Sequence, residues 1–138
     1  MTEKDESGSA AAPTLVTIRR SEAIDNVQRL AMFDGICDRT AGTRGLSMYR
    51  VVLPPGARGE AHYHRGYETA IFILKGEIVT RYGEGLRESV LHRQGDFVFL
   101  PADLPHQPVN PSATETAEAI VARNDPSEQE NVVLCDPA

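Results

Sequence analysis

Three of the four histidines in this chain stand at spacings that could build a metal site. His62 and His64 lie two residues apart, and Glu68 follows four residues after His64. Residues two or four apart on one strand share a face, so a strand over 62–68 would present two imidazoles and a carboxylate together. These groups are usual ligands of divalent transition metals. His106, from a distant strand, would complete the site.

Short apolar segments between turn residues predict the strands that would position these side chains. From Gly45 onward, segments rich in Val, Ile, Leu and Phe alternate with Pro, Gly, Asn and Asp at intervals of roughly ten residues. This spacing is typical of an all-β sandwich or barrel. The predicted strands cover residues 46–53, 61–64, 68–74, 77–82, 89–92, 96–100, 106–110, 116–123 and 131–134.

The N-terminal part of the chain carries different signals. Residues 1–13 are polar and rich in small side chains, which predicts a disordered tail. Ser21 is a potential helix cap, and the apolar residues after it favour a short helix over 22–32. We therefore expect one domain over 14–138, a length that buries a proper core.

The segment 68–74 has two largely apolar faces, unlike a strand that lies on a solvated surface. One face holds Glu68, Ala70, Phe72 and Leu74, and the other holds Thr69, Ile71 and Ile73. If Glu68 points into the barrel with Phe72, then Ile71 and Ile73 point outward. These two apolar side chains would then be exposed to solvent unless another surface packs on them. This pattern predicts a homodimer, since exposed strands need covering.

Composition narrows the classes of partner. The net charge of −6 argues against nucleic acid, because binding a polyanion requires a basic surface. No apolar run is long enough to span a membrane, and the N-terminus lacks the apolar segment of a signal peptide, so a cytoplasmic location is expected. Cys37 and Cys135 have no metal or redox spacing and are predicted to be free thiols.

Two blocks of the sequence carry a recognisable pattern of glycines and metal-ligand residues. The first block reads Gly56-ARGEA-His62-Tyr63-His64-RGY-Glu68-TAIFILK-Gly76. The second block reads Gly95-DFVFL-Pro101-AD-LP-His106-QPV-Asn110. Together they resemble the two motifs of the cupin superfamily, in its small single-domain form. The resemblance implies an antiparallel jelly-roll β-barrel that holds one divalent metal through His62, His64, Glu68 and His106.

The chain departs from these motifs at two positions. Gly76 follows Glu68 after seven residues rather than six, so counting back from Gly76 places Thr69 in the ligand position. A β-bulge would reconcile the two counts. Asp103 stands where the family has a glycine in a turn, and Asp is among the residues that best tolerate a left-handed backbone.

The expected chemistry depends on the metal, for which Fe(II), Mn(II), Ni(II), Zn(II) and Cu(II) all remain open. Open coordination positions beside three imidazoles favour a dioxygenase-type oxidoreductase acting on a small organic molecule. A metal-assisted isomerase, cyclase or lyase and a non-catalytic binding module are the alternatives. Phe72, Tyr82 and Arg50 are candidate substrate contacts, whereas His92 belongs to no motif and is expected in solvent.

Overall fold

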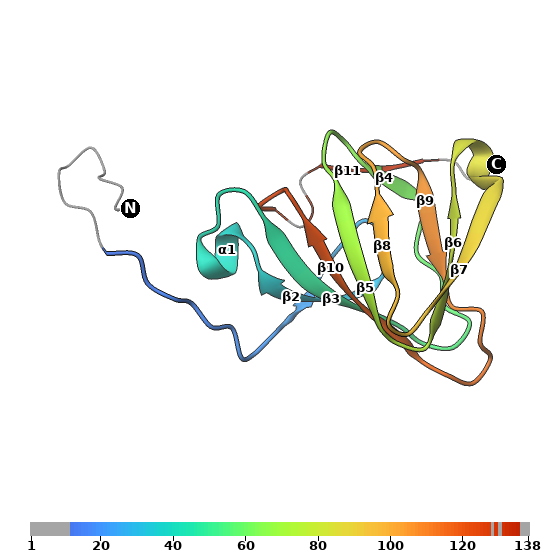
Figure 1. The fold of residues 1–138 in the computed structure, drawn as a ribbon, viewed down its shortest axis with the longest axis horizontal. Helices are drawn as coiled ribbons and strands as arrows, with labels where there is room; N and C mark the ends of the chain where they lie inside the picture. The colour runs from blue at the N-terminus through green and yellow to red at the C-terminus, as the bar shows by residue number, and fades with distance from the viewer. Residues whose placement is uncertain (1–11, 128, 130, 136–138) are drawn as a thin grey trace.

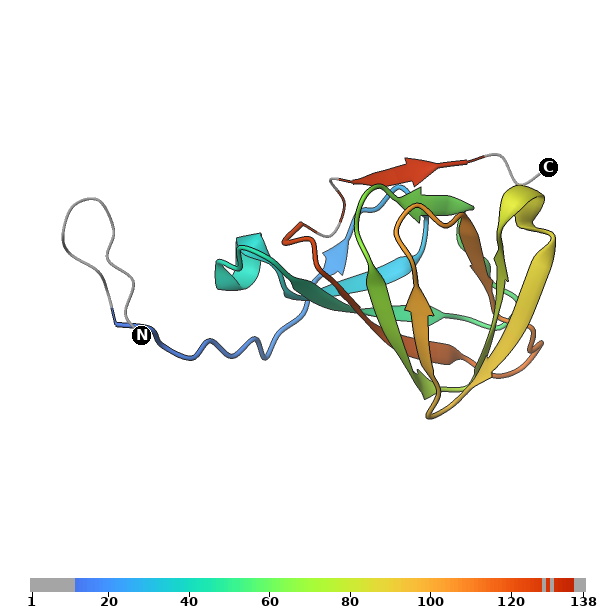
Figure 2. The same cartoon turned by 45° about the horizontal axis from the view of Figure 1, so that its top comes forward.

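The computed structural model describes residues 12–127, 129 and 131–135, which fold as two antiparallel sheets facing each other (Figures 1 and 2). Most of the predicted tail, residues 1–11, lies outside the described residues. The first sheet contains, in spatial order, β1 (Ala23–Ile24), β2 (Ala31–Ile36), β3 (Ser47–Leu53), β10 (Ala117–Arg123), β5 (Thr69–Lys75) and β8 (Phe97–Leu100). The second contains β11 (Val132–Leu134), β4 (His62–His64), β9 (His106–Val109), β6 (Glu77–Tyr82) and β7 (Glu88–Arg93).

This arrangement confirms the predicted all-β jelly-roll fold. All nine strands expected from residue 46 onward are present, with ends that differ by at most two residues. The described helices are short: α1 covers Asp38–Ala41 and η1 covers Glu84–Leu86. Within the described ranges, no helix has the length and apolar character that crossing a membrane requires.

The core lies between the two sheets and is built from alternate residues of the long strands. On β3 and β10 every second side chain is buried, as the period of a strand requires when one face is covered. The buried apolar cluster contains Met32, Tyr49, Val51, Leu53, Ile73, Ile78, Ala117, Ala119 and Val121. The pairing of β10 with both β3 and β5 therefore forms the wall of the barrel on which the site rests.

The predicted helix over 22–32 is wrong, because this segment forms a β-hairpin. Strand β1 pairs with β2, placing Ala23 opposite Phe33. Asn26 makes the turn, since its side-chain nitrogen donates to the carbonyl oxygens of Ile24 and Leu30, and its oxygen accepts from the Leu30 amide. Such local bonds from an Asn side chain compete with helical bonds. Arg29 completes the turn with a φ of 57°.

The predicted orientation of strand 68–74 is also wrong. Ile73 is 1% exposed and, like Ile71, lines the interior, whereas Phe72 packs on the outside against Phe97 with ring centroids 4.9 Å apart. The cause is a break in the strand: β4 ends at His64 in one sheet, and β5 begins at Thr69 in the other. The spacing between His64 and Glu68 thus does not lie on one strand.

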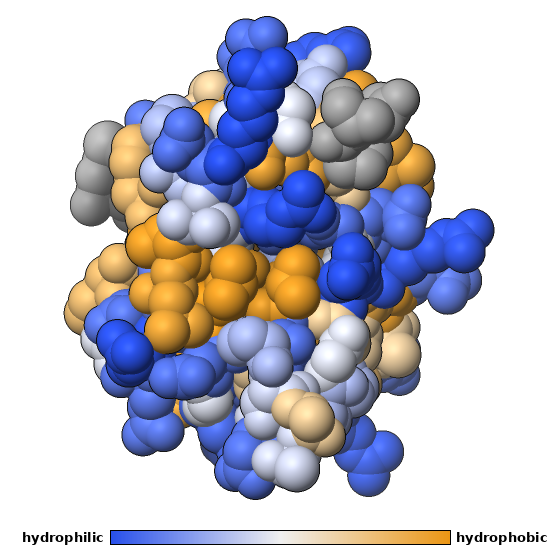
Figure 3. Space-filling view, turned by 90° about the vertical axis from the view of Figure 1, so that its right-hand side faces the viewer, coloured by the Kyte–Doolittle hydropathy of each residue, from blue (hydrophilic) through white to orange (hydrophobic). Residues whose placement is uncertain are grey.

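Exposed apolar side chains gather on the outside of the barrel. On β8, Phe97 is 84% exposed and Phe99 is 58% exposed, and Leu74 on the neighbouring β5 is also exposed. Strand β7 adds exposed Val90 and Leu91. In the space-filling view of the side that carries β6 and β7, apolar residues form a band across the surface (Figure 3). A surface of this kind usually marks an interaction site.

Candidate metal centre

Three buried histidines meet at one end of the barrel interior. One ligand atom from each of His62, His64 and His106 lies within 4.8 Å of the others, and all three residues are at most 6% exposed. His62 and His64 point the same way from β4, and β9 places His106 directly opposite His62. The ring centroids of His62 and His106 are 4.3 Å apart. The structure therefore brings together the three histidines that the sequence singled out.

Backbone carbonyls fix the protonation of two of these rings. The Nδ1 atom of His62 donates to the carbonyl oxygen of Glu60 at 2.7 Å, and the Nδ1 atom of His106 donates to that of Leu104 at 2.9 Å. A carbonyl oxygen only accepts, so each Nδ1 carries the hydrogen. Each Nε2 then keeps a free lone pair, which is the arrangement found in metal-binding histidines.

His64 has a different partner, the guanidinium group of Arg123. The Nη1 atom of Arg123 donates to Nδ1 of His64 at 2.6 Å, and Nη2 donates to the hydroxyl oxygen of Tyr49 at 3.1 Å. Arg123 is 3% exposed, so this positive charge is held inside the protein beside the histidines. Sequence reasoning missed Arg123, although it continues the buried face of β10 that Ala117, Ala119 and Val121 begin.

The three imidazoles are neutral at physiological pH. Burial lowers the pKa of His62 to about 3, with a further contribution from His106. Burial lowers the pKa of His106 to about 4, despite its bond to the Leu104 carbonyl, which acts in the opposite direction. Burial and the charge of Arg123 also lower the pKa of His64. Neutral imidazole is the form that binds metal, and His62 and His106 each offer a free Nε2 lone pair to a divalent transition ion. His64 differs, because its Nδ1 accepts from Arg123 and its hydrogen is therefore on Nε2, so it would bind an ion on release of that hydrogen.

Glu68 is not brought to the histidines. Its side chain is exposed, and its backbone amide donates to Asn124 Oδ1 at 2.8 Å in the loop before β5. The alternative count from Gly76 places Thr69 in this position, and Thr69 is 2% exposed and lines the interior. Among the described residues, the group that could hold a metal ion consists of histidines alone.

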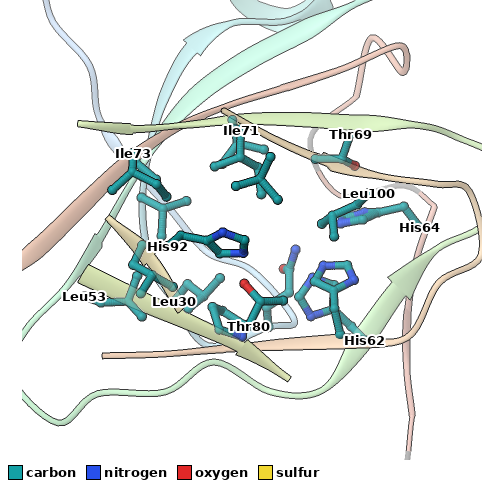
Figure 4. Close-up of a pocket in the computed structure, with 18 of the residues that line it drawn as sticks. Leu30, Leu53, His62, His64, Thr69, Ile71, Ile73, Thr80, His92 and Leu100 are labelled. Atoms are coloured by element: carbon teal, nitrogen blue, oxygen red, sulfur yellow. The ribbon is translucent and has the colours of Figure 1, made fainter. Parts of the chain in front are cut away.

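An apolar cavity extends from the histidines into the barrel (Figure 4). The space open to the centre of a water-sized sphere is about 60 Å³, and roughly 10–15 Å³ suffices for one water, so the cavity holds several waters or one small molecule. Its walls include Leu53, Ile71, Ile73, Val98 and Leu100, with polar side chains from Gln28, Thr69, Thr80 and His92.

His92 lies in this cavity, which corrects the expectation that it is solvated. It lines the wall from β7, and its ring is seen beside Leu30 and Leu53 (Figure 4). Burial lowers its pKa, while the charge of Asp96 acts in the opposite direction. The sequence predicted the strand that carries His92 but held no signal for which face of that strand turns inward.

The three candidate substrate contacts lie away from the cavity wall. Phe72 is on the outer face of β5. Arg50 pairs with Glu118 at 3.3 Å and stacks on the ring of Phe33, 4.5 Å from its centroid. Tyr82 is half-buried opposite His106 on the neighbouring strand, but it is not among the residues that line the cavity. The polar side chains that do line the cavity include those of Gln28, Thr69, Thr80 and His92.

Asp103 supports the loop beside His64, as its place in the second motif suggested. Its φ of 67° is left-handed, the conformation expected where the family has glycine. The Asp103 amide donates to the His64 carbonyl at 3.1 Å, and its carboxylate accepts from the Gly66 amide at 3.0 Å. These bonds tie the end of β4 to the loop before β9, so they fix the distance between the two histidine-bearing strands.

The metal-free protein is expected to lose stability as the pH falls below about 6.5. Between the ordinary value of 6.5 and the lowered pKa values of about 3 for His62 and about 4 for His106, the unfolded chain binds protons that the folded chain does not. The free energy of unfolding should therefore fall by up to about 1.4 kcal/mol per pH unit for each histidine. Urea denaturation at pH 7, 6 and 5 measures this slope. The double variant His62→Gln, His106→Gln should flatten it; an equal slope would contradict the assignment.

Comparison with known proteins agrees with this geometry. The family model of the cupin domain matches residues 49–123. A cupin 2 conserved barrel domain protein from Salinispora arenicola is 21% identical, with a TM-score of 0.63 over 83% of this chain and 91% of that chain. No curated protein matches the sequence at a significant level.

Two oxalate enzymes have similar structures. Recombinant oxalate oxidase in complex with glycolate is 21% identical, with a TM-score of 0.70 over 94% of this chain and 68% of that chain. Oxalate decarboxylase from Bacillus subtilis is 18% identical, with a TM-score of 0.70 over 94% of this chain and 34% of that chain. At these identities the likeness shows a shared fold. With more than half of its residues matched by the family model, the chain belongs to the cupin domain family.

Proposed function

We propose that this protein is a metal-dependent enzyme that acts on a small organic molecule inside the barrel, as a dioxygenase-type oxidoreductase. The observation that carries the proposal is the convergence of His62, His64 and His106 at one end of an apolar cavity. Three protein ligands on a six-coordinate ion leave positions for a substrate and dioxygen together, which is the chemistry that Fe(II) would supply there.

The charges around the site favour an anionic substrate. Three neutral imidazoles leave the charge of a divalent ion uncompensated, because no carboxylate belongs to the described ligand group. Arg123 adds a guanidinium group in contact with His64. A buried positive centre stabilises an anion in a medium of low dielectric constant. We therefore infer that the substrate carries a carboxylate or a similar acidic group, as do the substrates that the two similar oxalate enzymes are named for.

The cavity residues have roles that do not depend on the metal. The apolar walls formed by Ile71, Ile73, Val98 and Leu100 exclude water from the bound molecule. His62 and His106 are held by backbone carbonyls, so their rings need no rearrangement to present Nε2. Arg123 orients the ring of His64 and places positive charge next to it.

A metal-assisted isomerase or lyase is the second candidate, and His92 is the observation that favours it. Such a reaction needs a group that accepts or donates a proton within reach of the substrate. Burial lowers the pKa of His92, so its ring is neutral near pH 7 and offers one nitrogen as a base. A non-catalytic binding module would use the same cavity without turnover.

Oxygen uptake by the Fe(II)-loaded protein tests the proposal. The metal is stripped with a chelator, Fe(II) is restored, and an oxygen electrode records uptake with a panel of small hydroxy and keto acids. We expect uptake that depends on both iron and substrate, and its loss in His62→Ala. Turnover of a substrate under strict anaerobiosis would instead support the isomerase or lyase, and tight binding without any turnover would support the binding module.

We also infer that the protein forms a homodimer through the outer face of β5 and β8. The register places Phe72 opposite Phe97 and Ala70 opposite Phe99, so apolar side chains of both strands share this face with Leu74. The highly exposed Phe97 and Phe99 would be covered by the same face of a second copy, as a self-complementary interface requires.

Replacing Phe97 with Glu should shift the protein toward monomer, since a buried pair of like charges at a symmetric interface is unfavourable. Light scattering at tens of micromolar measures the mass of the wild type and the variant. Lys75→Glu is the control, because Lys75 is exposed at the end of the neighbouring strand β5. A monomeric wild type, or a dimer unaffected by Phe97→Glu, would contradict this interface.

A further inference from the structure

We infer that the cavity binds a small hydroxylated carboxylic acid, whose hydroxyl group is recognised by polar atoms of Gln28, Thr69 and His92. The carboxylate part of this inference rests on the proposed function, since it assumes a metal at the three histidines. The hydroxyl part rests on the cavity wall alone. It concerns residues outside the histidine group, of which the motifs mark Thr69 alone, as an alternative metal-ligand position.

The wall of the cavity contains three buried polar atoms without a hydrogen-bond partner in the described part of the chain. They are Oε1 of Gln28, Oγ1 of Thr69 and Nε2 of His92. Gln28 is 1% exposed and Thr69 is 2% exposed, so solvent at the protein surface does not reach them. A buried polar atom without a partner is costly, and proteins rarely keep one without a reason. Three such atoms on one cavity indicate partners that enter it.

The chemistry of these atoms selects a hydroxyl group. Oε1 of Gln28 only accepts hydrogen bonds, so its partner must donate one. The Thr69 hydroxyl can donate or accept a hydrogen bond. Nε2 of a neutral His92 ring donates if it carries the ring hydrogen and accepts if Nδ1 carries it. A hydroxyl group meets these requirements because it donates one bond and accepts others. A fully ionised dicarboxylate offers no hydrogen to Gln28, and a hydrocarbon offers nothing to any of the three.

The polar atoms begin beside the histidines and continue along the cavity. The backbone carbonyl of Gln28 accepts from the Glu60 amide at 2.6 Å, two residues before His62. His92 lies further along, because it faces Ile78 on β6, four residues before the Tyr82 that pairs with His106. In the close-up, Thr69 lies near His64 while His92 reaches inward from the opposite part of the wall (Figure 4). A molecule held at the histidines by its carboxylate would extend toward these atoms.

The size of the cavity limits this molecule to a few carbon atoms. A volume of about 60 Å³, where roughly 10–15 Å³ suffices to hold one water, accommodates only a small molecule. Lactate and 3-hydroxypropionate are of this size, and propionate is the matched acid without the hydroxyl group. The apolar side chains of Leu53, Ile73 and Val98 then surround the carbon chain.

Calorimetric titration of the metal-loaded protein with lactate, 3-hydroxypropionate and propionate tests the inference. We expect at least one hydroxy acid to bind about tenfold more tightly than propionate, the effect of supplying a partner to an otherwise unsatisfied buried group.

Thr69→Val, Gln28→Met and His92→Phe remove the three polar atoms one at a time with little change in volume. At least one variant should reduce the preference for the hydroxy acid over propionate to about threefold or less. The same variant should keep the wild-type affinity for propionate, which also shows that it is folded. Equal affinities in the wild type, or a ratio that none of the variants changes, would overturn the inference.

A neutral pair of probes separates this inference from the proposed function. Lactamide and propionamide differ by the same hydroxyl group but need no metal, so they are titrated into the metal-free protein. Preference for lactamide, reduced by Thr69→Val or His92→Phe, supports hydroxyl recognition even if no metal binds. Equal binding of both amides to the metal-free protein, together with equal binding of the acids to the loaded protein, would overturn hydroxyl recognition while leaving the metal site intact.

Discussion

Replacing His106 with Ala is expected to lower the affinity for a divalent metal by about 100-fold or more. Residues that merely support a metal ligand already change affinity by about 10- to 100-fold, so loss of a ligand should exceed that range. His106 comes from β9 and faces His62 on β4, and its removal leaves two ligands on one strand. Equilibrium dialysis of stripped protein against Zn(II) or Fe(II), followed by elemental analysis, measures both affinity and stoichiometry.

Glu68→Ala is the matched control for this experiment. Glu68 belongs to the first motif, but its side chain is exposed and outside the histidine group, so its removal should leave the metal affinity unchanged. Thr69→Val is a second control at the position that the count from Gly76 selects. A large loss in Glu68→Ala would show that this carboxylate reaches the metal and would support the four-ligand site that the motif implies.

Gly76→Ala is expected to lower the free energy of unfolding by about 2–4 kcal/mol, because it combines backbone strain with a steric clash. Gly76 has a φ of 74°, a left-handed conformation that disfavours a Cβ. A Cβ built there would lie 2.8 Å from the carbonyl oxygen of Thr116 and 3.0 Å from Cα of Ala117. Both are backbone atoms where β10 begins, so neither moves aside at low cost. Urea denaturation of the two proteins measures the difference.

Gly56→Ala separates the strain from the clash. Gly56 is also a motif glycine and has a φ of 73°, but a Cβ there would meet nothing within 4 Å. It should therefore cost only the left-handed strain, about 1–2 kcal/mol. Equal losses for the two variants would mean that the contact between the β5–β6 turn and β10 is not tight, contrary to the structure.

The strands could be predicted because apolar segments and turn residues are local signals. Each predicted strand after residue 46 ends at a proline, a glycine or a polar turn in the sequence, and the structure places its ends accordingly. The three histidines were found for a similar reason: their residue type and motif spacing are explicit in the sequence. The convergence of β4 and β9 then follows from the fold that the motifs imply.

The hairpin near the N-terminus could not be predicted from periodicity. Ile24, Val27 and Leu30 have helical spacing, but the amide group of Asn26 binds the backbone on both sides of it. The pairing of β2 with β3 then stabilises an extended conformation over Ala31–Ile36. Tertiary pairing of this kind routinely overrides a weak local preference.

The face of β5 was predicted wrongly because the chain changes sheets between His64 and Thr69. Alternation along a strand holds only while the strand continues, and the turn at Gly66, with a φ of 75°, interrupts it. This single change moves Phe72 outward and Ile71 inward. His92 was missed for a related reason, since nothing in 89–92 shows which side faces the interior.

X-ray absorption spectroscopy of the Fe(II)-loaded protein shows directly whether His62, His64 and His106 together hold one divalent ion at the end of the cavity. We expect one iron per chain and a spectrum whose multiple-scattering features require three imidazole ligands. A loaded protein with one imidazole ligand or none on its iron would contradict it.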